Sequence, residues 1–176
     1  MRIAVSGTHR VGKSTLVGDL AEELRGHRVV DEPYHLLEDE GFEFSDPPVL
    51  EDWIAQLRRS LEELEADGSP NLLLDRCPVD LLAYALAGED RDAFDLDEWL
   101  PRVRASVRTL DLVVFVPLEH PDRIPVGPGE DPALRVAVDR TLAEVLLEDS
   151  LGLELEVLSV EGSPRERVGQ VLRRIR

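Results

Sequence analysis

Apolar residues occur along the chain in short runs that alternate with longer segments, where they recur at helical spacing. The runs predict strands at residues 2–6, 28–33, 71–77 and 110–118, and a fifth strand within residues 153–162. The periodic segments predict helices over 13–25, from Pro47 (capped by Asp46) to about Ala66, and over about 79–87, 96–107 and 133–148, with a last one after Pro164. Strands that alternate with helices predict an α/β fold with a parallel sheet covered on both faces.

The chain shows no repeat, low-complexity tract or long linker, so we expect a single domain over residues 1–176. Apolar residues make up 43% of the sequence, but no run approaches the ~18 residues of a membrane span. The first residues do not form a signal peptide, and the single cysteine, Cys77, fits a reducing compartment. We therefore expect a cytoplasmic protein without membrane association.

A phosphate-binding motif follows the first predicted strand. Residues 7–14 match G-x-x-x-x-G-K-[ST], between an apolar strand and a helix. The glycines let backbone N–H groups approach phosphates, and the helix N-terminus adds further donors and a partial positive charge. The motif predicts a nucleotide-binding loop made of Gly7, Thr8, His9, Arg10, Val11, Gly12, Lys13, Ser14 and Thr15.

Lys13 is the only lysine among 20 lysine and arginine residues. Arginine is bulkier and planar, so it does not replace a compact ammonium in a phosphate cradle. We expect Lys13 to contact the β- and γ-phosphates, Ser14 to hold Mg²⁺ and Thr15 to reach the α-phosphate. The net charge of −17 argues against general nucleic-acid binding, which needs a basic surface.

Charged residues follow the second and third predicted strands, and ligands of such sheets bind beyond the carboxyl ends of the strands. Asp75, after Leu72–Leu74, is a candidate Mg²⁺ ligand, and Arg76 is placed to neutralise a transferred phosphoryl group. Glu32 is the first candidate for a general base toward an acceptor hydroxyl, and Asp31 is the second. The alternative is that these groups are ordinary solvated charges, or that Asp75 and Arg76 form a salt bridge.

These residues give the chain a resemblance to the P-loop kinases of the nucleoside and nucleotide kinase group. Glu32-Pro33 resembles the Glu-Pro of deoxynucleoside kinases, and Asp75-Arg76 resembles a pair that these share with thymidylate kinases. The whole layout, including residues 75–86 and 111–121, is most similar to a small AAA-type ATPase/kinase-like family related to nicotinamide riboside kinases. The resemblance implies a P-loop three-layer sandwich with strand order 2-3-1-4-5, and ATP and Mg²⁺ as cofactors.

By the same resemblance, residues 119–131 form a short lid with a catalytic arginine, Arg123, and Gly162-Ser163-Pro164 lies near the adenine. One lid arginine argues against a nucleoside monophosphate as acceptor. Arg135 and Arg140 either touch the ligand or pair with surface acids. Four aromatic residues either line an acceptor pocket or belong to the core, namely Phe42, Phe44, Trp53 and Tyr84.

The sequence therefore predicts an ATP-dependent kinase that acts on a small hydroxyl-bearing acceptor, such as a nucleoside or nucleotide. A regulatory NTPase switch and a polynucleotide 5′-end kinase remain as alternatives, and the oligomeric state stays open. A GTPase of the usual kind needs an Asn-Lys-x-Asp motif, which requires a second lysine. A transporter ATPase needs an "LSGGQ"-like segment, and an AAA+ ring ATPase needs a helical lid domain for which there is no room.

Overall fold

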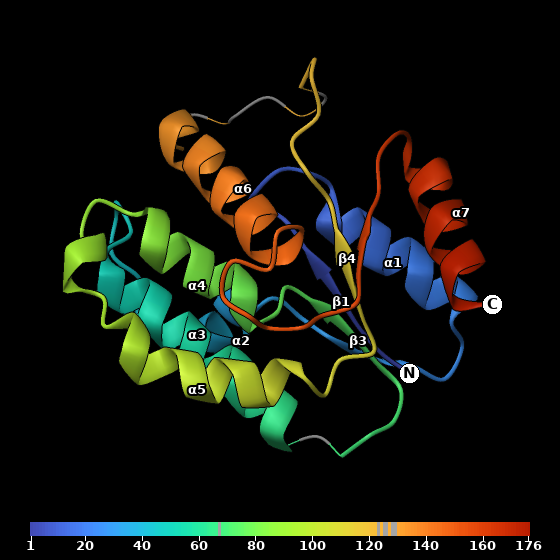
Figure 1. The fold of residues 1–176 in the computed structure, drawn as a ribbon, viewed down its shortest axis with the longest axis horizontal. Helices are drawn as coiled ribbons and strands as arrows, with labels where there is room; N and C mark the ends of the chain where they lie inside the picture. Colours follow the sequence, from blue (N-terminus) through green and yellow to red (C-terminus); the bar gives the residue numbers. More distant parts are fainter. Residues whose placement is uncertain (67, 123, 125–126, 128–129) are drawn as a thin grey trace.

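The structure is a computed structural model that describes residues 1–66, 68–122, 124, 127 and 130–176. Five parallel strands form the central sheet: β1 (Arg2–Ser6), β2 (Arg28–Val30), β3 (Leu72–Asp75), β4 (Leu112–Phe115) and β5 (Val157–Ser159) (Figure 1). Their order is β2-β3-β1-β4-β5, which confirms the predicted order. In register, Val5 of β1 lies beside Asp75 of β3, so the ends of these two strands meet at one edge of the sheet.

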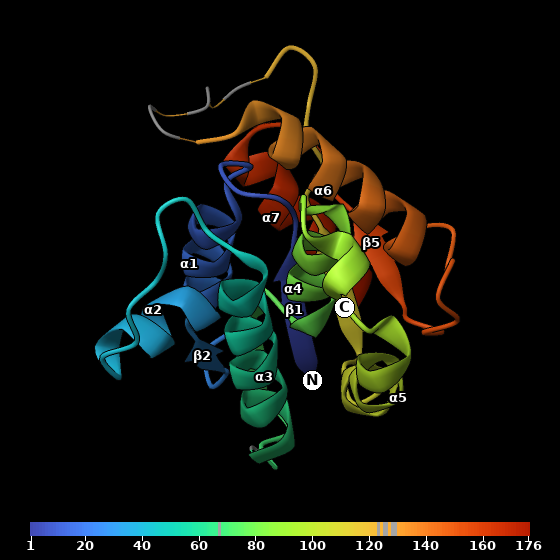
Figure 2. The same ribbon diagram turned by 90° about the vertical axis from the view of Figure 1, so that its left-hand side faces the viewer.

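Helices cover both faces of this sheet (Figures 1 and 2). They are α1 (Lys13–Glu23), α2 (Pro33–Asp39), α3 (Leu50–Ala66), α4 (Pro78–Ala87), α5 (Leu96–Val107), α6 (Pro132–Leu146) and α7 (Pro164–Ile175), with a 3₁₀ turn at Arg91–Ala93. α1 and α7 pack on one face, and α3 to α6 pack on the other. The predicted α/β three-layer arrangement is confirmed.

Alternation along the strands divides the apolar side chains between two cores. In β3, Leu72 and Leu74 join the core under α3 to α6, whereas Leu73 joins the core under α1 and α7. All three leucines are buried, as expected for a strand of a parallel sheet that is covered on both faces. This packing fixes the strand ends, and with them the loops that carry the charged residues.

β2, β3 and β4 are shorter than the predicted strands at 28–33, 71–77 and 110–118, and two helical regions also differ from the prediction. α2 was not predicted, although Pro33 at its first position, after Glu32, is a typical helix start. α3 begins at Leu50 and not at Pro47, because Pro48 disfavours a helical conformation at the residue before it. The turn ahead of α3 is held by Asp52, whose carboxylate accepts a 2.9 Å hydrogen bond from the Val49 N–H.

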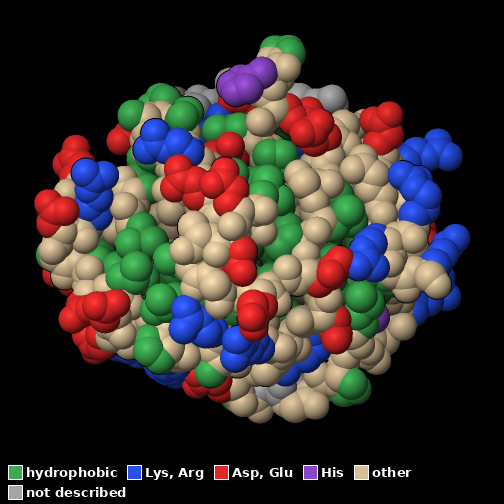
Figure 3. Space-filling model, viewed as in Figure 1, with side chains coloured by type: hydrophobic (Ala, Val, Ile, Leu, Met, Phe, Trp, Pro, Cys, Tyr) green, Lys and Arg blue, Asp and Glu red, His purple; other side chains and the backbone are tan. Residues whose placement is uncertain are grey.

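On the face drawn in Figure 3, acidic and basic side chains of the described residues are interspersed, and basic groups gather mainly at the edge formed by α7. Among the described helices, none combines the length and the apolar character needed to cross a membrane.

Candidate active site around the phosphate-binding loop

The loop between β1 and α1 has the tight path that the motif requires. A Cβ on Gly7 would lie 2.5 Å from the Val116 carbonyl oxygen, so only glycine fits there. Gly12 has φ of 88°, a left-handed conformation that glycine adopts without strain. α1 then begins at Lys13, which places the N-terminus of this helix directly at the loop.

Lys13 lies inside the loop, with a side chain that is only 5% exposed. Its ammonium donates a 2.8 Å hydrogen bond to the Thr8 carbonyl. Burial, helped by the positive charge of Arg76, lowers the pKa of Lys13 to about 8, although nearby carboxylates act in the opposite direction. The lysine is therefore a poorly compensated cation, suited to a phosphate group.

Asp75 has the surroundings expected of a metal ligand. The residue is 4% exposed, and its Oδ1 has no hydrogen-bond partner within the described part of the chain. Burial raises the pKa of Asp75 above its ordinary value, although a hydrogen bond with Ser14 and the charge of Lys13 lower it. A buried carboxylate beside a hydroxyl offers the hard oxygen ligands that Mg²⁺ prefers.

No group of three or more histidine, cysteine and acidic side chains able to hold a metal occurs among the described residues. Mg²⁺ typically binds through one or two protein oxygens together with water and substrate phosphates. Ser14 and Asp75 fit that arrangement, whereas a cage made only of protein ligands does not.

Glu32 and Arg76 come from the ends of β2 and β3 and form an ion pair through the Arg76 Nε. Arg76 also donates a 3.2 Å hydrogen bond to the Gly7 carbonyl, so the pair lies against the loop. Burial raises the pKa of Glu32, but the charges of Arg76 and Lys13 outweigh it, and the pKa lies below its ordinary value. Arg76, at φ of 72° and 6% exposed, stays charged. An ionised carboxylate and a fixed cation thus meet beside the phosphate site.

The sequence-based prediction missed Asp80, which holds this arrangement together. The residue is fully buried, and its carboxylate accepts hydrogen bonds from the N–H groups of Gly7 at 2.8 Å and Cys77 at 3.0 Å. It also lies 3.8 Å from Arg76. Its position three residues into the helix after Cys77-Pro78 is a capping-box pattern, and that signal was present in the sequence.

Tyr84, whose role the sequence left open, links the loop to the helices under it. Its hydroxyl accepts a 3.0 Å hydrogen bond from the His9 N–H and lies 2.9 Å from the His9 Nδ1. Its ring stacks on Trp53 at 4.4 Å and lies 5.2 Å from the Arg76 guanidinium. Burial lowers the pKa of His9 to about 4, so this histidine is neutral near pH 7. Tyr84 belongs to the buried core, so its stack with Trp53 packs Trp53 against that core.

The remaining predicted residues separate into two groups. Thr15 lines a cavity of about 160 Å³ together with Gly162 and Pro164, which is where the prediction placed the nucleotide base. The Arg140 side chain, in contrast, is 74% exposed, and its only ion pair among the described residues is with Glu144, on the same helix. Arg123 lies outside the described residues. Phe44 stacks on Tyr34 and lies edge-on to Phe42.

Two further buried arginines border the same cavity. Arg135, from α6, donates to the His9 carbonyl, and Arg167, from α7, donates to the Val11 carbonyl. The sequence left the role of Arg135 open and gave no signal for Arg167, which lies 156 residues beyond Val11. Glu119 accepts from both Arg167, at 2.9 Å, and the Gly162 N–H, at 2.7 Å.

Comparison with known families agrees with this geometry. Residues 2–167 match the model of a family described as an AAA domain. The chain belongs to this family. The match spans the phosphate-binding loop, both charged strand ends and the segment up to Arg167, so the whole site lies within the family domain. A search of the curated proteins gives no significant match.

Several solved structures share the fold. Deoxyadenosine kinase from M. mycoides with bound dATP superposes with a TM-score of 0.71 at 14% identity, over 99% of each chain. Thymidylate kinase from Candida albicans gives 0.64 at 18% identity, over 98% of this chain and 89% of that one. The NadR protein in complex with NAD and AMP-PNP gives 0.69 at 19% identity, over 97% of this chain and 48% of that one. At these identities the likeness shows the fold.

Proposed function

We propose that this protein is an ATP-dependent phosphotransferase that acts on a small hydroxyl-bearing acceptor. The observation that carries the proposal is the Glu32–Arg76 ion pair beside the phosphate-binding loop. A carboxylate at this position is not needed to bind a nucleotide, but it is needed to accept a proton from an acceptor. The fold shared with deoxyadenosine and thymidylate kinases supports the same proposal.

In the proposed reaction the acceptor oxygen forms a bond to the γ-phosphorus of ATP, and the bond from that phosphorus to the β–γ bridging oxygen breaks. Glu32, ionised near neutral pH, takes the proton of the hydroxyl. Arg76 and Lys13 stabilise the charge on the phosphoryl group and on the departing ADP. Ser14 and Asp75 would hold Mg²⁺, which supplies further charge neutralisation when bound.

The charge of the segment around Glu32, where the acceptor would bind, favours an acceptor without a phosphate group. No lysine or arginine occurs between Arg28 and Arg58, a segment that contains Glu32, α2 and the start of α3. Arg59, near this segment, is engaged by Glu40 at 3.0 Å and Glu63 at 2.6 Å. A nucleoside monophosphate would place its dianion among carboxylates, whereas a nucleoside or a similar neutral alcohol would not.

The alternative of a regulatory adenine-nucleotide switch predicts turnover that no acceptor accelerates. The alternative of a polynucleotide 5′-end kinase predicts that an oligonucleotide is the best acceptor. The experiment is ADP release from ATP·Mg²⁺ by the purified protein, with nucleosides, nucleoside monophosphates, sugars and a 5′-hydroxyl oligonucleotide as acceptors.

Two variants give the experiment its control. Glu32→Gln should lower kcat by about 10²–10⁴, the range for loss of a general base, while ATP affinity stays within about twofold. Glu38→Gln changes an exposed carboxylate on α2 and should leave kcat within about twofold. Equal loss in both variants, or equal turnover with and without every acceptor, would reject the proposed kinase.

A further inference from the structure

The outer side of the phosphate-binding loop is held by two guanidinium groups. Arg135 donates from Nε to the His9 carbonyl at 3.0 Å and from Nη2 to the Arg10 carbonyl at 2.8 Å. Arg167 donates from Nη1 to the Val11 carbonyl at 2.6 Å. Three consecutive carbonyls of the loop are therefore held by side chains from α6 and α7. These helices lie more than a hundred residues later in the sequence.

Because the peptide bond is planar, these contacts on the outer side of the loop also determine which way its N–H groups point. In a trans peptide unit, the C=O of one residue and the N–H of the next point in opposite directions. Fixing the carbonyls of His9, Arg10 and Val11 toward the arginines therefore directs the N–H groups of Arg10, Val11 and Gly12 away from them. Within the described residues, these three N–H groups make no hydrogen bond of normal geometry.

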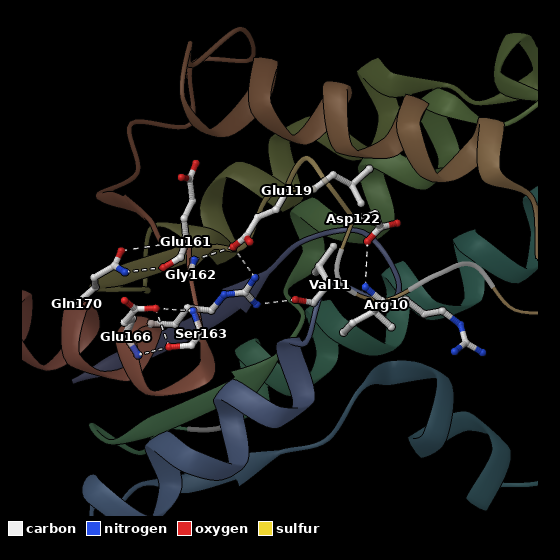
Figure 4. A network of polar contacts seen from close by, with 12 residues as sticks. Arg10, Val11, Glu119, Asp122, Glu161, Gly162, Ser163, Glu166 and Gln170 are labelled. Atoms are coloured by element: carbon white, nitrogen blue, oxygen red, sulfur yellow. Dashed lines mark hydrogen bonds and ion pairs between the residues drawn. The ribbon is translucent and has the colours of Figure 1, made fainter.

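Both guanidinium groups also form an ion pair with a carboxylate, in addition to their hydrogen bonds with the loop. Arg135 pairs with Asp122 and is 2% exposed, and Arg167 pairs with Glu119 and is 7% exposed. Each arginine thus connects the loop to the segment that follows β4, where Glu119 and Asp122 lie (Figure 4). Glu119 is only 13% exposed, so it would stay largely buried and unpaired if Arg167 left it for a phosphate. Asp122 is 37% exposed, but it holds Arg135 through both terminal nitrogens of the guanidinium.

We propose that Arg135 and Arg167 are positioning residues that preorganise the N–H groups of Arg10, Val11 and Gly12 for the nucleotide phosphates. Neither arginine contacts the transferred phosphoryl group in this proposal. The proposal rests on the nucleotide site of the proposed function but not on its acceptor or its chemistry. It can therefore be tested by nucleotide binding alone, even if no acceptor is ever found.

The test compares Arg135→Lys and Arg167→Lys with the wild-type protein. Lysine keeps the positive charge but cannot bridge a carbonyl and an acid as a planar fork does. We expect the Kd for ADP·Mg²⁺ and for ATP·Mg²⁺ to rise about tenfold in each variant, because charge-assisted N–H bonds to phosphate lose their alignment. At saturating ATP, kcat should change by less than about threefold.

Matched controls lie on the same two helices. Arg140→Lys, on α6, and Arg174→Lys, on α7, replace exposed arginines whose ion pairs in the described part of the chain are with the exposed acids Glu144 and Glu156. Both variants should bind nucleotides as the wild type does. Unchanged Kd values in the Arg135 and Arg167 variants would overturn the proposal. A fall in kcat with unchanged Kd would also overturn it, since the arginines would then act on the transferred group.

A second measurement covers variants that fail to fold. In ¹⁵N-labelled wild-type protein, adding ADP·Mg²⁺ should move the amide proton signals of Arg10, Val11 and Gly12 downfield, as new hydrogen bonds to phosphate do. The amides of Gly26 and Gly41, in remote turns, should not move. If the three loop amides stay unshifted at saturation, their N–H groups do not face the phosphates and the proposal is wrong.

Discussion

Raising the pH should remove the positive charge of Lys13 well before that of an ordinary lysine. Its pKa of about 8 in the free protein means that the side chain is about nine-tenths protonated at pH 7, half at pH 8 and one-tenth at pH 9. Bound phosphates favour the ammonium form, so nucleotide binding must protonate the neutral fraction. We therefore expect the apparent affinity for ATP to fall about tenfold between pH 7 and pH 9.

The same linkage predicts a proton count. Each ATP bound should take up about half a proton at pH 8, and about nine-tenths of a proton at pH 9. Calorimetry in two buffers of different ionisation enthalpy measures this uptake. The γ-phosphate of ATP is fully ionised above about pH 8, so it contributes little to the proton uptake.

The same shift affects the stability of the fold. The pKa of Lys13 is lower in the folded than in the unfolded protein, so the unfolded state binds more protons between about pH 8 and about pH 10.5. The free energy of unfolding should therefore rise with pH over this range as far as Lys13 contributes to it.

The sequence makes the pKa directly observable, since selective ¹³Cε-lysine labelling gives one signal for the whole protein. That signal should titrate near pH 8 in the free protein and well above pH 9 with bound ADP. In Glu32→Gln its midpoint should move lower still, because the Glu32 charge raises the pKa of Lys13. A free-protein midpoint at the ordinary 10.5, or an ATP affinity that is flat from pH 7 to pH 9, would refute the reasoning.

Three further substitutions test other contacts of the site. Asp75→Asn should raise the Mg²⁺ concentration for half-maximal turnover about tenfold or more, measured by titrating Mg²⁺ at fixed ATP, because a neutral amide is a weaker ligand. Arg76→Lys should lower kcat about 10–10³-fold with a smaller change in ATP affinity, since lysine lacks the fork; an unchanged kcat would exclude a transition-state role. Tyr84→Phe should cost about 1–3 kcal/mol by leaving the His9 N–H unpaired, seen as a lower urea midpoint, whereas Tyr34→Phe should leave the midpoint unchanged.

The sequence was sufficient to predict the contacts that follow from topology. Parallel strands bring their carboxyl ends to one edge, so Glu32, Asp75 and Arg76 had to lie near the loop after β1 once the strand order was set. Contacts that depend on helix packing could not be predicted in this way. The reach of Arg167 to Val11 depends on the rotation of α7 against α1, which no local pattern encodes. Asp80 was missed because an acid in a first helical turn has a sufficient local explanation as a cap.

The same contacts explain why lysine and arginine have different roles in this site. Arg76, Arg135 and Arg167 each bind a carbonyl of the loop and a carboxylate from another segment, so their planar donors are used in two directions at once. Lys13 has three donors, of which the Thr8 carbonyl accepts one, and no carboxylate of the described residues lies within ion-pair distance. Two donors of a compact ammonium are thus left for phosphate oxygens. An arginine in place of Lys13 would need a carboxylate in the plane of its guanidinium group, and the loop does not offer one. This is a physical reason for a chain rich in arginine to place its one lysine here.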